Sequence, residues 1–146
     1  MLSPEALLSL SKCPGGSRIL IADANYPSDN IASECVVKTP IRINGTTCEI
    51  LEALIKVIPL DRRNEERLGV MDRTDEDKAR NLEVPAYQML FSVAGLVKEI
   101  EMEKIERFKF YEDSKKSYLV IQSTDTALYA NCMIRKGCMD KDGNPC

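Results

Sequence analysis

Asp23 has the clearest setting for chemistry in this sequence, because its carboxylate follows the apolar run Ile19-Leu20-Ile21, with only Ala22 between them. An apolar run that stops at Asp, followed closely by Asn and Pro, predicts a buried strand with Asp23 at its carboxyl end. In an open α/β sheet, ligands bind at the carboxyl ends of the strands. The sequence therefore predicts a ligand site around Asp23.

Four further polar residues stand out by their context. Asp61 comes just beyond a predicted helix, and Arg107 lies between apolar residues. Tyr129 and Asn131 both belong to the last predicted strand. Carboxylates accept hydrogen bonds strongly and a guanidinium offers several donors in one plane, so these residue types together suit a ligand that carries hydroxyl groups.

Each of these residues also has a purely structural explanation. Asp23 can cap a helix, and Asp61 can stand in solvent. Arg107 can pair with Glu112, and the ring of Tyr129 can simply pack against its neighbours. The residues taken one by one do not decide between these explanations and a shared site.

Length and charge restrict the class of protein. The chain has 146 residues, which is typical of one domain, and we expect a single domain over 1–140 and a disordered tail at 141–146. Its 20 basic and 23 acidic residues include no basic stripe, so no nucleic-acid partner is expected. No apolar run reaches the ~20 residues of a membrane span, and no secretory signal is evident. We expect a cytoplasmic protein that does not bind membranes and acts on a small molecule.

The chain contains six cysteines and no histidine. In a full-sized domain without export signals, cysteines are expected to be reduced thiols. None of them forms a Cys-x-x-Cys pair, and no histidine is available to join them, so the sequence predicts neither a zinc site nor another cofactor.

Helix signals are frequent along the chain. Ser3-Pro4-Glu5 is a typical helix start, and Thr46-Thr47-Cys48-Glu49 matches a capping box. The charged segment 61–73 is expected to be a solvated loop or an exposed helix. The predicted helices are 3–11, 47–58, a short helix capped by Thr74 and Asp77, 86–94 after Pro85, and a turn at 111–116.

Strand signals alternate with these helices. The predicted strands are 19–23, 35–37, a short strand into Phe108, 118–121 and 127–134. Because strands and helical segments are mixed along the chain, the sequence predicts an α/β domain.

Seven short motifs lie in order between Leu2 and Gly137. They are Leu2-Ser3-Pro4-Glu5, Asp23-Ala24-Asn25-Tyr26-Pro27, Pro59-Leu60-Asp61, Ile105-Glu106-Arg107-Phe108, Phe110-Tyr111-Glu112, Ala127-Leu128-Tyr129 and Arg135-Lys136-Gly137. In this order they resemble the fucose mutarotases, which are relatives of the ribose pyranases. The motifs Pro59-Leu60-Asp61 and Phe110-Tyr111-Glu112 are similar to the fucose branch rather than to the ribose branch.

The resemblance implies a structure and an activity. The structure is a three-layer α/β/α domain with a central sheet that assembles into a ring-shaped homo-oligomer, with a monosaccharide such as L-fucose in a cleft at the subunit interface. The activity is that of an isomerase, which exchanges the α and β anomers of the free sugar by acid/base ring opening and needs no cofactor. Carried over by motif, the sugar-binding residues are Asp23, Asp61, Arg107, Tyr129 and Asn131, and Tyr129 is also the candidate for proton transfer.

The chain departs from the family pattern in two places. The family has a general acid/base histidine eight residues before the aspartate, where this chain has Gly15. Histidine titrates near neutral pH, so its absence removes the usual catalyst of ring opening. In addition, Ser123-Thr124-Asp125 replaces the Thr-Gly-Glu that the family has before the tyrosine.

Three interpretations therefore remain open. In the first, the chain is a mutarotase of reduced rate that uses Tyr129, an aspartate or a bound water in place of the histidine. In the second, it binds a monosaccharide without turning it over, and in the third the ring is a structural scaffold. Cys13 lies in the same loop as Gly15 and is a further, weaker candidate for the acid.

Overall fold

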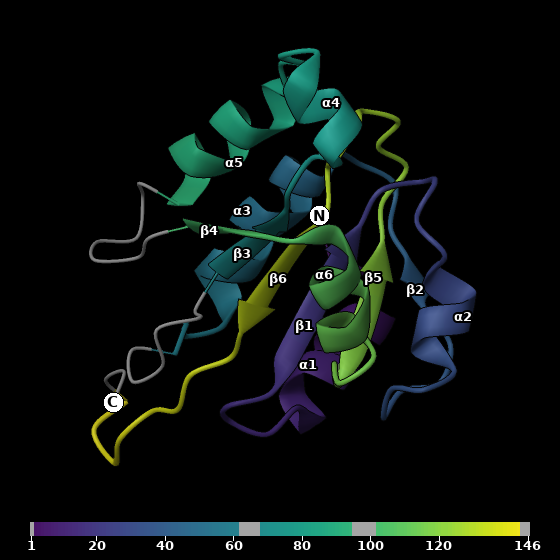
Figure 1. The fold of residues 1–146 in the computed structure, drawn as a ribbon. Helices are drawn as coiled ribbons and strands as arrows, with labels where there is room; N and C mark the ends of the chain where they lie inside the picture. Colours follow the sequence, from purple (N-terminus) through teal and green to yellow (C-terminus); the bar gives the residue numbers. More distant parts are fainter. Residues whose placement is uncertain (1, 62–67, 95–101, 144–146) are drawn as a thin grey trace.

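The computed structural model describes residues 2–61, 68–94 and 102–143 and centres on one mixed sheet. Within these residues the sheet has six strands in the order β2-β5-β1-β6-β3-β4 (Figure 1). The strands are β1 (Arg18–Ala22), β2 (Ile41–Arg42), β3 (Leu68–Met71), β4 (Met102–Ile105), β5 (Leu119–Gln122) and β6 (Cys132–Arg135). Strand β6 runs antiparallel to its neighbours β1 and β3, whereas the other pairs are parallel.

Helices alternate with these strands, and their first residues show why they form. Ser3 accepts a hydrogen bond from the amide of Ala6, and Thr46 accepts one from the amide of Glu49, so both predicted N-caps are present. The helices are α1 (Pro4–Lys12), α2 (Ser28–Ala32), α3 (Thr47–Val57), α4 (Asp75–Ala79), α5 (Pro85–Ala94) and α6 (Arg107–Ser114).

Strand β1 shows how the sheet is covered on both faces. Ile19 and Ile21 belong to a core cluster that also holds apolar residues of α1, α3 and α5. Leu20 and Ala22 point to the opposite face and pack in a second cluster with residues of α2 and α6. The order helix, sheet, helix is visible in Figure 1, and it confirms the predicted three-layer α/β/α domain with a central sheet.

The strand directions bring several chain segments to one edge of the sheet. Ile21 pairs with Ile121 of β5 and with Cys132 of β6, so the end of β1 lies beside the end of β5 and the start of β6. Val70 also pairs with Cys132, and Met71 pairs with Ile105. The residues that follow β1, β3 and β4, together with those that precede β6, therefore meet at this edge.

Two strand predictions differ from the structure in the middle of the chain. The predicted strand 35–37 is wrong, because these residues form bends in which Val37 donates a single backbone hydrogen bond to Tyr118, and the strand lies at β2 instead. The predicted loop or helix at 61–73 contains strand β3, while 62–67 lie outside the described residues.

Two boundaries near the C-terminus also differ. The strand predicted to end at Phe108 ends at Ile105, because the Glu106 side chain accepts hydrogen bonds from the amides of Phe108 and Lys109 and starts α6 there. The strand predicted from Ala127 begins only at Cys132, since Tyr129 has a positive φ of 58° and lies in a turn.

The ends of the domain add two observations. Of the tail predicted to be disordered, 141–143 form a turn and 144–146 lie outside the described residues. Across the described helices, none combines the length and apolar character that a membrane crossing requires.

Candidate functional site

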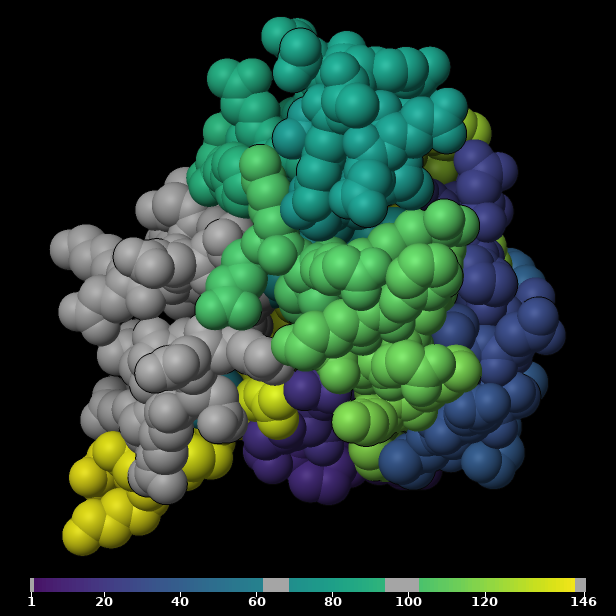
Figure 2. Space-filling view, viewed as in Figure 1, coloured from purple at the N-terminus to yellow at the C-terminus, as the bar shows by residue number. Residues whose placement is uncertain are grey.

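A cavity of about 250 Å³ opens at the sheet edge where these segments meet. It brings together four of the five predicted site residues, Asp23, Arg107, Tyr129 and Asn131. The cavity also borders α4 and α6, whose teal and green surfaces adjoin on the face seen in Figure 2. The topology thus places polar side chains from four distant parts of the sequence around one hollow.

Asp23 and Asn131 form the buried floor of this site. Asp23 is 6% exposed and Asn131 is 3% exposed. The Asp23 amide donates to Oδ1 of Asn131 at 2.8 Å, and Nδ2 of Asn131 donates to Oδ2 of Asp23 at 3.2 Å. The amide of Asn25 donates to the other carboxylate oxygen at 3.0 Å. The carboxylate of Asp23 is therefore fixed in one orientation.

The environment of Asp23 also changes its acidity. Burial raises its pKa above the ordinary value for aspartate, and the nearby Asp125 adds to this shift. Hydrogen bonds from Asn25, Tyr26 and Asn131 oppose the shift without cancelling it. Asp23 therefore holds a proton more readily than an exposed aspartate does.

Arg107 is exposed at the first turn of α6 and lines the cavity. Its guanidinium lies 5.7 Å from the ring centre of Tyr111 and 5.8 Å from that of Phe108. Glu112 pairs with Lys115 at 3.0 Å, and among the described residues no carboxylate forms an ion pair with Arg107. The structural explanation of Arg107 as a partner of Glu112 is therefore wrong, and its hydrogen-bond donors remain available to a ligand.

Tyr129 is half-buried and reaches α4 across the cavity. Its phenol donates a short hydrogen bond to Oδ2 of Asp77, and it accepts one from the amide of Thr74 at 3.2 Å. The hydrogen bond from Tyr129, followed by the contacts with Arg80, lowers the pKa of Asp77. The sequence predicts Thr74 and Asp77 only as a helix cap, and no local pattern indicates their contact with Tyr129, which lies more than 50 residues away in the chain.

Asp61 does not join the other predicted site residues within one chain. Asp61 is 7% exposed, which excludes the solvent-exposed position considered above, and its amide donates to the carbonyl oxygen of Arg135. Arg135 pairs with Arg18 at the start of β1, whereas Asp23 follows the end of β1. The two aspartates therefore lie towards opposite ends of this strand.

The loop that contains Gly15 lies at the same end of the sheet as Asp61. The amide of Gly16 donates to the carbonyl oxygen of Lys136 at 2.6 Å, and Gly15 packs against Cys138. Cys13 in this loop is 3% exposed, and burial raises the pKa of its thiol. Neither Gly15 nor Cys13 lines the cavity around Asp23 in the same chain.

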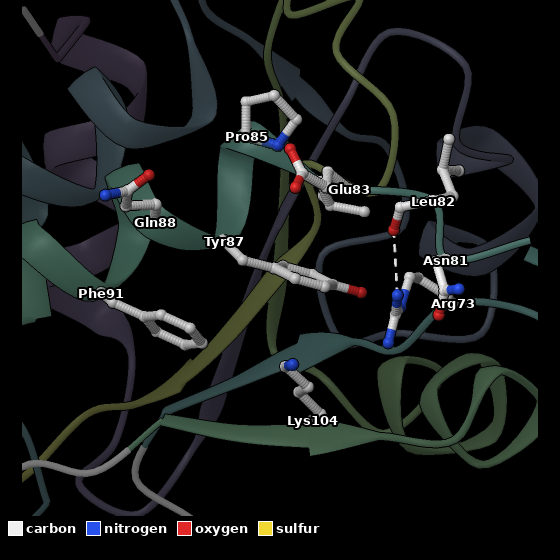
Figure 3. Close-up of a pocket in the computed structure, with 10 residues that line it drawn as sticks. Arg73, Asn81, Leu82, Glu83, Pro85, Tyr87, Gln88, Phe91 and Lys104 are labelled. Atoms are coloured by element: carbon white, nitrogen blue, oxygen red, sulfur yellow. Dashed lines mark hydrogen bonds between the residues drawn. The ribbon is translucent and has the colours of Figure 1, made fainter. Parts of the chain in front are cut away.

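A second cavity of about 590 Å³ lies beside α5 and contains none of the predicted site residues. Tyr87 and Phe91 line it with near-parallel rings, and Lys104 lies 5.0 Å from the ring centre of Tyr87 (Figure 3). The phenol of Tyr87 donates to the carbonyl oxygen of Met71 at 2.5 Å. This contact holds Met71, the last residue of β3, which also lines the first cavity. In neither cavity, nor elsewhere in the described ranges, do three acidic or cysteine side chains gather as a metal site would require.

Comparison with known proteins decides the family. Residues 1–139 match the RbsD / FucU transport protein family. The chain belongs to this family. The fucose mutarotase of Homo sapiens is 39% identical to it over 141 residues, which cover 94% of this chain and 89% of the human protein. These matches confirm the resemblance that the seven sequence motifs indicate.

Solved structures of RbsD / FucU proteins agree with the fold. The crystal structure of FucU from Bifidobacterium longum has a TM-score of 0.85 and 29% identity, and covers 95% of this chain and 97% of its own. The fucose mutarotase from Streptococcus pneumoniae, solved in complex with L-fucose, has a TM-score of 0.77 and 26% identity, with 94% of each chain covered. The α/β/α architecture is therefore that of the family.

Proposed function

We propose that this protein binds free L-fucose and exchanges its α and β anomers, at a rate reduced by the absence of histidine. The observation that carries the proposal is the convergence of Asp23, Arg107, Tyr129 and Asn131 on one cavity. Support also comes from the 39% identity to the human fucose mutarotase and from the fucose complex of the relative from Streptococcus pneumoniae.

The residues of the cavity suit a pyranose. Its hydroxyl groups donate to the fixed carboxylate of Asp23, and the guanidinium of Arg107 donates to sugar oxygens. Anomer exchange requires that the anomeric hydroxyl lose a proton while the ring oxygen gains one, after which the aldehyde closes on its other face. Tyr129 is the proposed proton-transfer group because its phenol lies at the cavity and is held in place by α4.

The position of Gly15 supports a site shared between subunits. Because Gly15 and Tyr129 lie near opposite ends of the sheet in one chain, a group in the Gly15 loop reaches the sugar only from a neighbouring copy. We therefore propose a ring-shaped homo-oligomer with the sugar at the subunit interface, to which Asp61 contributes from the adjacent chain. Cys13 is a poor replacement acid/base, since its buried thiol has a raised pKa.

A monosaccharide-binding protein without turnover is the second candidate. The specific observation in its favour is that Gly15 has no side chain to titrate, whereas the binding residues around Asp23 are in place. General acid/base catalysis contributes typically about a hundred- to ten-thousandfold to a rate, so its loss can leave binding without measurable exchange.

Saturation-transfer NMR on L-fucose separates the candidates. Exchange between the anomeric resonances faster than in buffer alone supports the mutarotase, and protein-dependent broadening without faster exchange supports the binding protein. If neither appears, both are contradicted and the scaffold interpretation stands. Y129F is expected to lower the exchange rate, whereas Y118F is the matched control, because Tyr118 lies outside the cavity.

A further inference from the structure

The contacts of the Tyr129 phenol account for its only proton. A tyrosine hydroxyl has one O–H to donate and lone pairs to accept with. In this structure the O–H is directed at Oδ2 of Asp77, and the phenolic oxygen accepts from the amide of Thr74 at 3.2 Å. What the phenol offers to a ligand in the cavity is therefore acceptor capacity alone.

Asp77 is well placed to impose this orientation. Its Oδ1 accepts from Nη2 of Arg80 at 2.7 Å, while Oδ2 accepts from Tyr129. Its own amide donates to the Thr74 hydroxyl, which fixes the first turn of α4. Both carboxylate oxygens are thus engaged within the protein, and the pKa of Asp77 is lowered, so it stays an ionised acceptor.

The backbone of Tyr129 reinforces the arrangement. Tyr129 has a φ of 58°, a conformation that residues other than glycine rarely adopt. A strained backbone persists only where surrounding contacts hold it, and here the hydrogen bonds to Thr74 and Asp77 act together with the packing of the ring against both core clusters.

We infer that Asp77 is a positioning residue that makes Tyr129 a hydrogen-bond acceptor toward the sugar. When the phenolic oxygen takes a proton from a sugar hydroxyl, its own O–H proton passes to Oδ2 of Asp77, so that the phenol gains one proton and loses one. This inference rests on the proposed function for the identity of the sugar. The contact between Asp77 and Tyr129 itself can be tested without any ligand.

The ligand-free test uses protein labelled with ¹³C at the ζ carbon of tyrosine. The chain has five tyrosines, and the resonance that disappears in Y129F identifies Tyr129. D77N is expected to shift this resonance, because an amide nitrogen can donate to the phenol and release its O–H. E76Q removes a charge from the same helix at an exposed position and should leave the resonance unchanged. An unshifted resonance in folded D77N overturns the inference, and D77S serves if D77N does not fold.

The functional test is a double-mutant cycle on L-fucose. D77N and Y129F are each expected to lower the anomer exchange rate by about tenfold or more, or the affinity where exchange is not measurable. D77N is expected to add less than about twofold on the Y129F background, since a positioning residue acts only through the group it orients. A further large loss from D77N in Y129F would mean that Asp77 contacts the sugar itself, and would overturn the inference.

The two tests fail in different ways. If the wild-type protein neither binds nor exchanges L-fucose, the proposed function fails, whereas the NMR shift in D77N still decides whether Asp77 orients Tyr129. If fucose is exchanged but D77N matches E76Q in rate, the proposed function stands and the role of Asp77 is rejected.

Discussion

The side chain of Asn131 forms hydrogen bonds with both the main chain and the side chain of Asp23. The Asn131 carboxamide accepts from the Asp23 amide at 2.8 Å and donates to the Asp23 carboxylate at 3.2 Å. This double contact joins the end of β1 to the start of β6, where the regular pairing of Ile21 with Cys132 stops. It therefore couples the stability of the sheet edge to the geometry of the candidate site.

Replacing Asn131 is expected to reduce both stability and binding. N131A leaves the buried Asp23 amide without its Asn131 partner and removes one of the hydrogen bonds to the Asp23 carboxylate, and an unsatisfied buried polar group costs about 1–3 kcal/mol. We expect the free energy of unfolding in urea to fall by about 2 kcal/mol. N30A is the control, since Asn30 is exposed on α2. An N131A variant as stable as N30A would contradict the role of this contact.

The raised pKa of Asp23 gives a second prediction, for the pH dependence of stability. The folded state holds the Asp23 proton more tightly than the unfolded chain, whose aspartates titrate near the ordinary 3.8. The protonated carboxyl therefore adds stability that is fully present below pH 3.8 and is lost as the pH rises through the folded pKa. Relative to D23N, the wild-type protein should be more stable at about pH 3.5 than at about pH 7.

Denaturant unfolding of both proteins at both pH values measures this difference. The D23N variant removes the titration of this group, so all other carboxyls cancel in the comparison. D29N, at an exposed position on α2, is the matched control and should show no comparable trend. If acidification instead lowers the free energy of unfolding of the wild-type protein relative to that of D23N, the pKa of Asp23 is lowered in the folded state. The hydrogen bonds to its carboxylate would then outweigh the effect of burial.

Much of this architecture follows from local sequence signals. The caps at Ser3, Thr46 and Thr74 mark three helix starts correctly, and the run that ends at Ala22 forms the buried strand that presents Asp23. These features depend on residues within one or two turns of each other, so a single sequence contains them. The layers follow because each strand has to be covered on both faces.

Contacts across the fold were not predictable in the same way. The contact of Tyr129 with Asp77 depends on a turn in which Tyr129 has a positive φ. The sequence pattern over 127–134 predicts a strand there and gives no sign of this turn. Asp61 carries a family motif, yet its place near Arg135 becomes evident only from the pairing of β6 with β1. Strand β3 follows a charged segment, which masked its short apolar pattern.

Two glycines provide a third prediction, on packing. A Cβ on Gly137 would lie 2.6 Å from the carbonyl oxygen of Leu60, a backbone atom of the segment that carries Asp61. A Cβ on Gly69 would lie 2.5 Å from Cδ1 of Ile105, which is the mobile end of a side chain. We expect G137A to lower the free energy of unfolding by about 3 kcal/mol and G69A by less than about 1 kcal/mol. Equal losses in thermal or urea unfolding would contradict this distinction.

The last prediction concerns Gly15 and introduces an imidazole at the position where the family resemblance implies a histidine. Gly15 does not have a positive φ, so its backbone accepts a side chain, but an added Cβ would lie 3.3 Å from the Cβ of Cys138. C138A keeps that Cβ and gives no relief, whereas C138G removes it. G15H combined with C138G is therefore expected to raise the fucose exchange rate, by up to about a hundred- to ten-thousandfold, and G15H alone by less.

The control for this gain is G15N with C138G, which fills similar space without a group that titrates near neutral pH. The gain from histidine should decline as the pH falls below about 6.5, the range in which a free imidazole becomes protonated and ceases to act as a base. Because Gly15 and Tyr129 lie near opposite ends of the sheet, the gain should also disappear when the protein is diluted to monomers. A folded, assembled G15H/C138G variant that exchanges fucose no faster than wild type would show that the cavity has diverged beyond this position.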